Sequence, residues 1–446
     1  MESPARPKAV LVAVKLHDVD DEEHQASIAE LGRLVATLGY DTIATITQSR
    51  DHLAAAAVIG EGKLLELAEI TGGTGHVGTT APKRKDKARL KRQGEEESTR
   101  DVNAASEPKV ALVAVDHDIS PSQARNLERA TGSQVLDRTG VIIEIFHRHA
   151  KSREARLQVE IARLHYTAPR MRESSGSKER QHGRGSGEAA LELDRRKVRD
   201  RIAELKEELE RIQADQGVRR AHRKDARRVA LVGYTNAGKS SLMRGLTGSH
   251  VYVEDKLFAT LDTTVRALQP EAKPRILVSD TVGFIKKLPH DLVASFKSTL
   301  DEAHEASHLL HVVDAADPSW PAQLEVTREV LAEIGANTVP STLVFNKIDR
   351  LSDAAKKSLA IRFPDAWLVS AHDPADVRRL RDSIEELFAS QWIEEEHVVP
   401  YAKQRIVSEM HEEGRVVEER YEEDGVHVRL RATEATHAKL RAEVAP

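Results

Sequence analysis

Gly233-Tyr-Thr-Asn-Ala-Gly-Lys-Ser240 is the stretch around which the chain is organised. It fits the pattern G-x-x-x-x-G-K-[ST] of a phosphate-binding loop. The apolar run before it, 228–233, predicts a buried strand, and the run after it, 241–246, predicts the opening of a helix. A glycine-rich turn between strand and helix directs backbone N–H groups at anionic oxygens, and the helix dipole adds to that attraction. The stretch therefore predicts a phosphate site in an α/β domain.

Each residue of this loop has an expected role in holding a phosphorylated ligand. Lys239 would reach the β- and γ-phosphates, and the Ser240 hydroxyl would ligate Mg²⁺. The alternative, a chance match in a glycine-containing loop, is disfavoured by the flanking strand and helix. We expect the other positions to contact the nucleotide as well: Gly233, Tyr234, Thr235, Asn236, Ala237 and Gly238.

Three further elements follow, each after an apolar run that predicts a strand. Asp280-Thr281-Val282-Gly283 looks like a D-x-x-G element, whose Asp holds Mg²⁺ through water and whose Gly N–H meets the γ-phosphate. The other two are Asn346-Lys347-Ile348-Asp349 and Ser370-Ala371. Four elements in this order leave little room for chance, and the stretch resembles a GTPase of the translation-factor-related class.

The Asp349 side chain indicates which base is bound. An ionised carboxylate only accepts hydrogen bonds, so Asp349 can take both the N1–H and the 2-amino group of guanine. Adenine offers no such pair of donors, and the residue therefore predicts GTP rather than ATP. A backbone N–H in Ser370-Ala371 is expected to close over the guanine O6.

Length and composition set outer bounds. The 446 residues are enough for about three domains. The chain has no cysteine, which excludes disulfides, thiolate metal sites and cysteine nucleophiles. The net charge of −5 does not indicate nucleic-acid binding overall, so any RNA contact must come from local clusters. With no apolar run long enough to span a membrane, we expect a soluble protein. The absence of cysteine fits a reducing cytoplasm, and a monomer is expected.

The first 150 residues predict a small α/β domain. Ser120 is expected to cap a helix that has Pro121 at its first position. The run 135–146 contains strand-like pieces, and 72–109, poor in large apolar residues, predicts a disordered insertion whose basic run is more simply a solvated loop than an RNA contact. Further strands are expected at 8–14, 41–46 and 110–115, a helix at 26–38, and a strand followed by a helix in 57–70.

Stretches from two parts of the chain together resemble the HflX family of GTPases. The resemblance covers nearly the whole chain apart from 72–109 and the last fifty or so residues, a count with the ~2–4 residue uncertainty of any boundary. The stretches are GEGK (60–63), SPSQARNLE (120–128), VLDRTGVIIEIF (135–146), REARLQVEIARLHY (153–166), LELDRRKVRDRI (191–202), GYTNAGKS (233–240), LFATLD (257–262), DTVGFI (280–285) and NKID (346–349).

The resemblance implies an α/β fold in four parts: a P-loop GTPase domain, mostly parallel sheet with flanking helices, preceded by an α/β N-terminal domain and a long helical hairpin. The expected boundaries are 1–149 for the N-terminal domain, 150–227 for the hairpin with its Gly/Arg-rich loop and basic linker, 228–392 for the G domain and 393–446 for a small C-terminal domain. The loop in 183–196 departs from the usual family form, because Ala189 stands where members carry Thr.

The resemblance also implies a switch segment. By family position Thr260 is the switch threonine, which completes the Mg²⁺ shell only when a γ-phosphate is present. The residues alone leave Thr263 and Thr264 as competitors. The segment expected to contact GTP is Phe258, Ala259, Thr260, Leu261 and Asp262.

The hydrolysis machinery looks incomplete. Ras-type enzymes place a water-orienting Gln just after D-x-x-G, but Phe284 holds that position here and cannot polarise water. No catalytic residue beyond Lys239 is identified, and we expect an external partner to complete the site. Asn236 is typical of GTPases that bind K⁺; the alternative is that it only stabilises the loop.

The resemblance implies binding to the ribosome, chiefly the large subunit and its rRNA, and splitting of stalled or idle ribosomes. Two other functions stay open: a GTP-gated RNA-binding switch acting off the ribosome, and a regulatory adaptor timed by GTP. The C-terminal residues predict a strand–strand or helix–strand unit, in which His427 and His437 are interpreted as isolated surface or packing residues rather than ligands.

Overall fold

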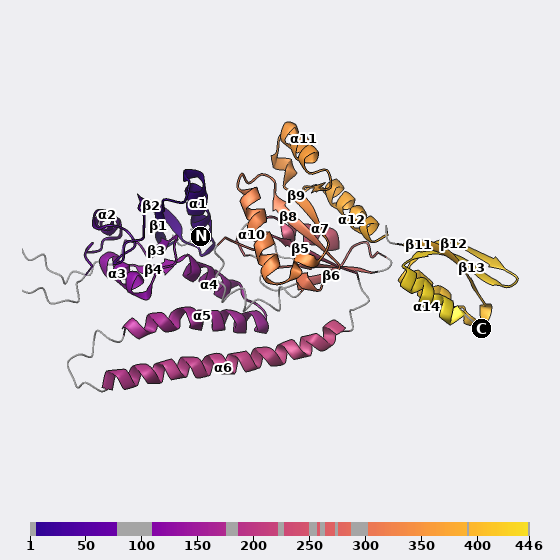
Figure 1. The fold of residues 1–446 in the computed structure, drawn as a ribbon, viewed down its shortest axis with the longest axis horizontal. Coiled ribbons are helices and arrows are strands. Elements are labelled where there is room, and N and C mark those ends of the chain that lie inside the picture. Colours follow the sequence, from indigo (N-terminus) through magenta and orange to yellow (C-terminus); the bar gives the residue numbers. More distant parts are fainter. Residues whose placement is uncertain are drawn as a thin grey trace, which may run out of the picture. The chain divides into compact units, whose positions relative to one another are not determined.

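The computed structural model describes residues 6–77, 109–174, 186–221, 227–248, 257–258, 264–272, 275–286, 302–389 and 392–444. The chain divides into two compact units (Figure 1). The first holds Met1–Arg148 and Glu160–Glu204, and the second holds His149–Val159 and Leu205–Pro446. Most of the expected 72–109 insertion, together with Ala259–Thr263, lies outside the described residues.

The first unit is built on a four-stranded parallel sheet of order β2-β1-β3-β4. Alternate residues of β1, among them Val10 and Val12, join an apolar core with Leu64 of α2 and Leu127 of α3. Helix α1 also packs on β1, where Leu11 meets Gly32. The bounds are β1 Lys8–Lys15, α1 Asp21–Thr37, β2 Asp41–Ser49, α2 Glu61–Thr71, β3 Leu112–Val115, α3 Pro121–Thr131, β4 Gln134–Asp137 and α4 Arg138–His149.

Helix α3 begins as the sequence predicts. Ser120 accepts a hydrogen bond from the Gln123 N–H, Gln123 bonds back to the Ser120 N–H, and Pro121 opens the helix. The strand-like reading of 135–146 is wrong after Asp137, because 138–149 form helix α4. Val141, Ile142, Ile143, Ile145 and Phe146 are all buried, and an apolar run buried on nearly every side has no period that separates strand from helix.

Helices α5 (Arg153–Ser174) and α6 (Ser186–Ala221) follow. Arg153, at the start of α5, contacts Glu208 in the second half of α6 at 2.5 Å, as an antiparallel pair requires. Two expectations need correction: residues 186–196 of the supposed Gly-rich loop are helical, and so is 218–221 of the supposed linker. The glycines suggested a loop in the first segment, and the run of basic residues suggested a linker in the second. Helix α6 includes residues from both segments.

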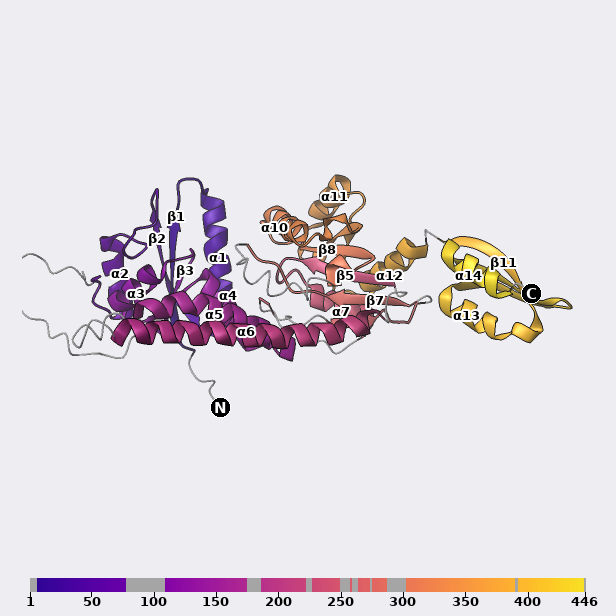
Figure 2. The ribbon, with the colours of Figure 1, turned by 60° about the horizontal axis from the view of Figure 1, so that its bottom comes forward.

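The second unit contains a six-stranded sheet of order β10-β9-β8-β5-β7-β6, parallel except for β6. Figure 2 shows its strands β5, β7 and β8. Helices α7 and α12 share an apolar core with one set of strand residues, and α10 shares another with the opposite set. The bounds are β5 Arg227–Gly233, α7 Lys239–Thr247, β6 Thr264–Ala267, β7 Ile276–Asp280, β8 His308–Asp314, α10 Trp320–Glu333, β9 Ser341–Asn346, α11 Asp353–Arg362, β10 Trp367–Leu368 and α12 Pro374–Ala389, with short 3-10 turns η2 Ala336–Thr338 and η3 Ile348–Arg350.

A C-terminal module, residues 393–444, has its own apolar core. Its antiparallel sheet has the order β11-β13-β12, and helices α13 and α14 pack on it. Both expected forms of this unit, strand–strand and helix–strand, are present, because α13 is followed by β12 and β13. The bounds are β11 Ile393–Val399, η4 Tyr401–Lys403, α13 Arg405–Glu413, β12 Arg415–Glu422, β13 Gly425–Ala432 and α14 Glu434–Val444. Among the described residues, none of the helices combines the length and apolar character needed to cross a bilayer.

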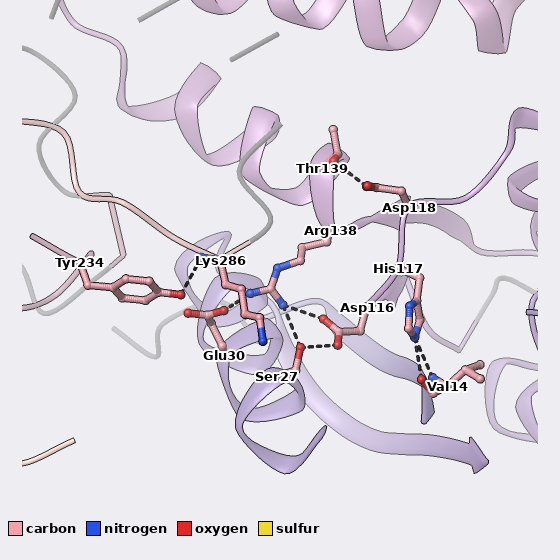
Figure 3. Close-up of polar contacts among 10 residues, drawn as sticks. All are labelled: Val14, Ser27, Glu30, Asp116, His117, Asp118, Arg138, Thr139, Tyr234 and Lys286. Atoms are coloured by element: carbon pink, nitrogen blue, oxygen red, sulfur yellow. Dashed lines mark hydrogen bonds and ion pairs between the residues drawn. The ribbon is translucent and has the colours of Figure 1, made fainter. Parts of the chain in front are cut away.

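The first unit buries a charged cluster at the carboxyl ends of its strands (Figure 3). Arg138, only 1% exposed, pairs with Glu30 and, at 2.6 Å, with Asp116. Ser27 donates to the second Asp116 oxygen at 2.5 Å. Next to it, Asp137 accepts hydrogen bonds from the Tyr166 hydroxyl and the Gly140 N–H. The D-R-T-G stretch at 137–140 thus has an internal structural role, with its charges matched inside the unit.

Candidate nucleotide-binding site

The second unit brings the predicted nucleotide motifs together. The phosphate loop follows β5, Asp280 ends β7, and Asn346 ends β9, and these strands lie in one parallel sheet. Ser370-Ala371 follow β10 at the same edge. Parallel strands end on a common side, so motifs far apart in sequence meet there. Hydrogen bonds between these segments support this arrangement directly.

Two glycines of the phosphate loop have no room for a side chain. Gly238 has φ +94° at the start of α7, and a Cβ there would lie 2.1 Å from Asn346 Nδ2. At Gly233 a Cβ would lie 2.2 Å from the Val312 carbonyl oxygen. Both positions combine a left-handed backbone with contact to a neighbouring strand, which only glycine tolerates. The close approach keeps the loop backbone over the sheet edge, with the helix N-terminus facing the site.

Lys239 is held inside the loop. Its ammonium donates to the carbonyl oxygens of Gly233 at 3.0 Å and Tyr234 at 2.9 Å, and the residue is 5% exposed. Burial lowers the pKa of Lys239 to about 8, while the Asp280 carboxylate acts in the opposite direction. A buried ammonium whose hydrogen bonds, within the described residues, go to neutral carbonyls is poised to gain from an anionic ligand. Polyphosphate would supply the charge that the loop itself does not.

The Ser240 hydroxyl and the Asp280 carboxylate form the oxygen pair that a hard cation prefers. Ser240 donates to Asp280 Oδ2 at 2.6 Å, and Asp280 is fully buried. Mg²⁺ favours carboxylate and hydroxyl oxygens together with phosphate and water. The donor set therefore fits Mg²⁺, and it stands beside the Lys239 ammonium at the phosphate end of the site.

Asn346 and Lys347 tie the phosphate loop to the strand edge. The Asn346 amide donates to the Ala237 carbonyl at 2.8 Å and accepts from the Ala371 N–H at 3.0 Å. Lys347 donates to the Asn236 carbonyl at 2.8 Å and pairs with Asp314 at 2.7 Å. Asp314 was missed by the sequence reasoning, because a single Asp at the end of a predicted strand belongs to no motif. These bonds make the base end and the phosphate end one rigid frame.

Asp349 is exposed and ready to accept. The Ser370 hydroxyl donates to it at 2.6 Å, and this bond lowers the pKa of the Asp349 carboxyl. The Ser370 N–H in turn donates to Asp376 at 2.8 Å, a second residue that the sequence reasoning missed. Asp376 lies in the first turn of α12, where a carboxylate fixes the preceding loop. An ionised, exposed Asp349 fits the recognition of guanine predicted from its chemistry.

The segment after β7 lies against the phosphate loop. The Thr235 N–H donates to the Phe284 carbonyl at 2.7 Å, and the Tyr234 hydroxyl accepts from the Lys286 N–H at 2.7 Å (Figure 3). Gly283 is needed here, since a Cβ would lie 2.7 Å from Thr235 Cα. The Phe284 side chain is 1% exposed and packs in an apolar core. It therefore points away from the place where an attacking water would stand.

The remaining predicted contacts divide into two groups. Phe258 lies beside the loop, where its N–H donates to the Thr235 hydroxyl at 3.0 Å, but its side chain is buried. The Thr281 hydroxyl donates to the Leu231 carbonyl at 2.8 Å, which makes that side chain a strand contact. Val282 is also buried, and Ile348 begins η3 beside Asp349. Ala259, Thr260, Leu261 and Asp262 lie outside the described residues.

A glycine cradle between strand and helix, a buried lysine within it, a Ser–Asp pair and an exposed Asp after β9 are the features of a P-loop GTPase. The comparisons with known proteins agree. Three family models match: "GTP-binding GTPase N-terminal" over 25–77 and 71–147, "GTP-binding GTPase Middle Region" over 149–223, and "50S ribosome-binding GTPase" over 228–347.

Relatives of known name cover most of the chain. GTPase HflX of Gluconacetobacter diazotrophicus is 62% identical over 92% of this chain and 91% of its own length. GTPase HflX of Escherichia coli is 40% identical over 78% and 75%. A solved structure of SsGBP with GDP aligns with a TM-score of 0.45 at 24% identity over 85% of this chain and 98% of that one, which carries no argument about function. The chain belongs to the HflX family of GTPases.

Proposed function

We propose that this GTPase works on the ribosome, binding the large subunit or whole ribosomes in its GTP state and splitting stalled or idle ones. The observation that carries the proposal is the buried Phe284. Phe284 holds the sequence position of the water-orienting Gln of Ras-type enzymes, but its side chain is packed in the core. Hydrolysis therefore needs a partner that supplies the missing group. The "50S ribosome-binding GTPase" description of the matching family model supports the ribosome as that partner.

In this proposal the chain's residues hold GTP in one frame. Lys239 leaves its carbonyl acceptors for the β- and γ-phosphates, and the backbone N–H groups of 236–240 surround them. Asp349 reads guanine, and the Ala371 N–H, which donates to Asn346 Oδ1 in this structure, would turn to the guanine O6. Ser240 and Asp280 would hold Mg²⁺, which neutralises charge between the β- and γ-phosphates. Thr260 is proposed to sense the γ-phosphate.

Potassium remains part of the proposal through Asn236. The residue adopts a left-handed backbone with φ 60°, and its carbonyl accepts from Lys347. Asn adopts that left-handed conformation more readily than most residues, and this alone explains why Asn stands at position 236. Binding of an activating K⁺ would be a second reason for Asn at this position. Equal turnover in potassium and sodium buffers at matched ionic strength would remove potassium from the mechanism.

The four-part division and a cytoplasmic, monomeric state complete the proposal, with boundaries at 1–149, 150–227, 228–392 and 393–446. The N-terminal part and the hairpin would bind rRNA, and the GTPase part would time that contact. Limited proteolysis would test the boundaries, because cleavage should concentrate near them. A protected 222–226 segment would contradict the second boundary.

The deciding experiment measures GTP turnover with and without ribosomes of the source organism, in potassium buffer, with sedimentation of subunits in parallel. Stimulation together with a shift from whole ribosomes to subunits is the expected result. Stimulation without that shift would keep ribosome binding and contradict splitting. Stimulation by purified RNA alone would favour an RNA-gated switch, and no response to either would favour an adaptor. The Lys239→Ala variant is the control for nucleotide dependence.

A further inference from the structure

The C-terminal module contains a cluster of metal-ligand side chains that the GTPase chemistry does not use. Glu395 and His397 lie two residues apart on β11 and therefore share one face of the strand. His437 comes from the first turn of α14, the helix that packs on β11. His437 is fully buried and His397 is 5% exposed. His437 is thus not isolated, as its sequence position suggested, but paired with a histidine 40 residues away.

The three ligand atoms converge. His397 Nε2 lies 2.8 Å from His437 Nδ1, and that Nδ1 lies 3.8 Å from Glu395 Oε2. All three atoms are within 4.8 Å of one another. Two ligands bound tetrahedrally at about 2.0–2.1 Å are separated by roughly 3.3 Å, and the two observed distances bracket that value. Small side-chain rotations would aim the three lone pairs at one point.

The surroundings orient these ligands as a metal site requires. His437 Nε2 lies 3.1 Å from the Ile393 carbonyl, so it carries the proton and leaves the Nδ1 lone pair directed at His397. A ligating histidine held by a carbonyl through its other nitrogen is the usual arrangement. Arg441 contacts both Glu395 oxygens at 3.3 Å, and a carboxylate has enough lone pairs to hold a metal as well.

We propose that Glu395, His397 and His437 bind one divalent transition-metal ion of the Zn²⁺ class, which joins β11 to α14. Two imidazoles and one carboxylate are the donors that such ions prefer, and three protein ligands leave a fourth position for water. Without metal, the His397 Nε2–H donates to His437 Nδ1; metal binding moves that proton to His397 Nδ1 by tautomerisation, and two metal–nitrogen bonds replace the hydrogen bond. The site is independent of the nucleotide site and of the proposed ribosomal function.

The module also supplies its own control. Glu422, Asp424 and His427 form a second group of three possible ligands, but Glu422 and Asp424 are exposed and none of the three is buried. Mobile, solvated side chains lose more freedom on binding a metal than buried ones do. If the chain bound metal only through scattered surface histidines, the His427 group would compete equally well. The buried group is expected to bind first and with a stoichiometry of one.

The test uses the full-length, tag-free protein, stripped with chelator and saturated with Mg²⁺ and GDP so that the phosphate site is occupied. Titration with Co²⁺ should give one equivalent of strong visible absorption typical of four-coordinate cobalt, and Zn²⁺ should displace it. His437→Gln keeps a donor for the Ile393 carbonyl but removes the Nδ1 ligand, and His397→Asn removes Nε2 from a similar shape. Each should abolish the bands, while His427→Ala should retain them.

Folding is checked independently by circular dichroism and by thermal unfolding. Zn²⁺ should raise the Tm of the wild-type protein and of His427→Ala, because a ligand that binds only the folded state stabilises it. It should leave the Tm of His437→Gln and His397→Asn unchanged. Absence of cobalt bands in the wild type would overturn the proposal. So would bands that persist in both buried-site variants or that disappear in His427→Ala.

Discussion

The four-stranded sheet and the six-stranded sheet of this protein place charged residues at the same kind of position, the carboxyl ends of parallel strands, and use them in opposite ways. At the carboxyl edge of the four-stranded sheet, Arg138 is matched by Glu30 and Asp116 within the fold. At the carboxyl edge of the six-stranded sheet, Lys239 is buried against neutral carbonyls. The first arrangement satisfies its charges internally, and the second leaves a cation to be satisfied by a ligand. A sheet edge can serve as a binding site when its backbone N–H groups and its charged side chains are left for a ligand to pair with.

The largest expected effect concerns the internally matched edge. Replacing Arg138 by Met brings two buried carboxylates together with no cation between them, and breaking a buried ion pair costs about 3–5 kcal/mol. We expect urea unfolding to show a loss of that size, with guanine-nucleotide affinity of the folded protein unchanged. Arg129→Met, at an exposed position of α3, is the matched control and should stay within about 0.5 kcal/mol. An unchanged unfolding midpoint for Arg138→Met would break the comparison.

The second substitution removes the buried cation at the carboxyl edge of the six-stranded sheet. Lys239→Ala removes the one ammonium directed at the phosphates and should weaken GDP and GTP binding by at least about 100-fold, since charge-assisted bonds to a desolvated anion are among the strongest. Stability should change little or rise, because the buried cation is removed. Isothermal titration gives the affinity and thermal unfolding gives the stability. Retained affinity would refute the assignment of the phosphate loop.

Asp349→Asn tests the base end of the same site. The carboxylate only accepts hydrogen bonds, whereas the Asn amide has one accepting oxygen and one donating NH2 group. One of the two bonds to guanine is therefore lost, and the amide NH2 faces a guanine N–H donor. Guanine affinity should fall by roughly 10- to 100-fold, equivalent to about 1.5–3 kcal/mol, while xanthine, which carries a carbonyl in place of the 2-amino group, should gain. Competition between GDP and XDP measures the exchange. Unaltered guanine preference would count against Asp349.

Phe284→Gln tests whether a Gln placed directly after D-x-x-G can orient the attacking water and raise intrinsic GTP hydrolysis. Because the Phe284 side chain lies in an apolar core, the Gln amide would be buried there rather than directed at water. We expect stability to fall by about 1–3 kcal/mol and turnover without a partner to stay at its basal value. A large rise in intrinsic GTP hydrolysis would show that the site was limited by this residue alone.

The smallest effect is a pH dependence. The pKa of Lys239 is lowered to about 8, and the charged form is the one that binds phosphate, so nucleotide binding should raise this pKa again. Above pH 8 the free protein has lost the proton, and binding must take it up; GDP affinity should therefore fall as pH rises from 8 towards 9, by at most about tenfold per unit. Titration in two buffers of different ionisation enthalpy measures the uptake. A GDP affinity that stays constant between pH 8 and 9, with no proton uptake on binding, would contradict this prediction.

The motifs of the candidate nucleotide site could be recognised in the sequence because each is a short, contiguous stretch. Lys239 and the Ser120–Pro121 helix start make their bonds to neighbours within a few residues, and the 280–283 and 346–349 elements each follow the end of a strand. It missed Asp314 and Asp376, whose partners Lys347 and Ser370 become neighbours only through the sheet or a loop.

The errors have the same origin. Residues 141–146 are strand-like by composition but form a helix buried on nearly all sides, where no period distinguishes the two. Arg138 meets Asp116 and Glu30 from 22 and 108 residues away, and His437 meets His397 across 40, so only the fold reveals these pairs. Groups that act through long-range contacts carry no local pattern to predict them.

The most direct test of the comparison is hydrogen exchange of the full-length protein with and without saturating Mg²⁺ and GDP. If the six-stranded sheet edge is the open one, amides of 233–247, 346–349 and 370–371 should slow strongly on binding. Amides of 116–118 and 137–140, at the edge whose charges are already matched, should exchange at the same rate in both states. Protection confined to the four-stranded sheet edge, or no protection in the phosphate loop, would contradict the account.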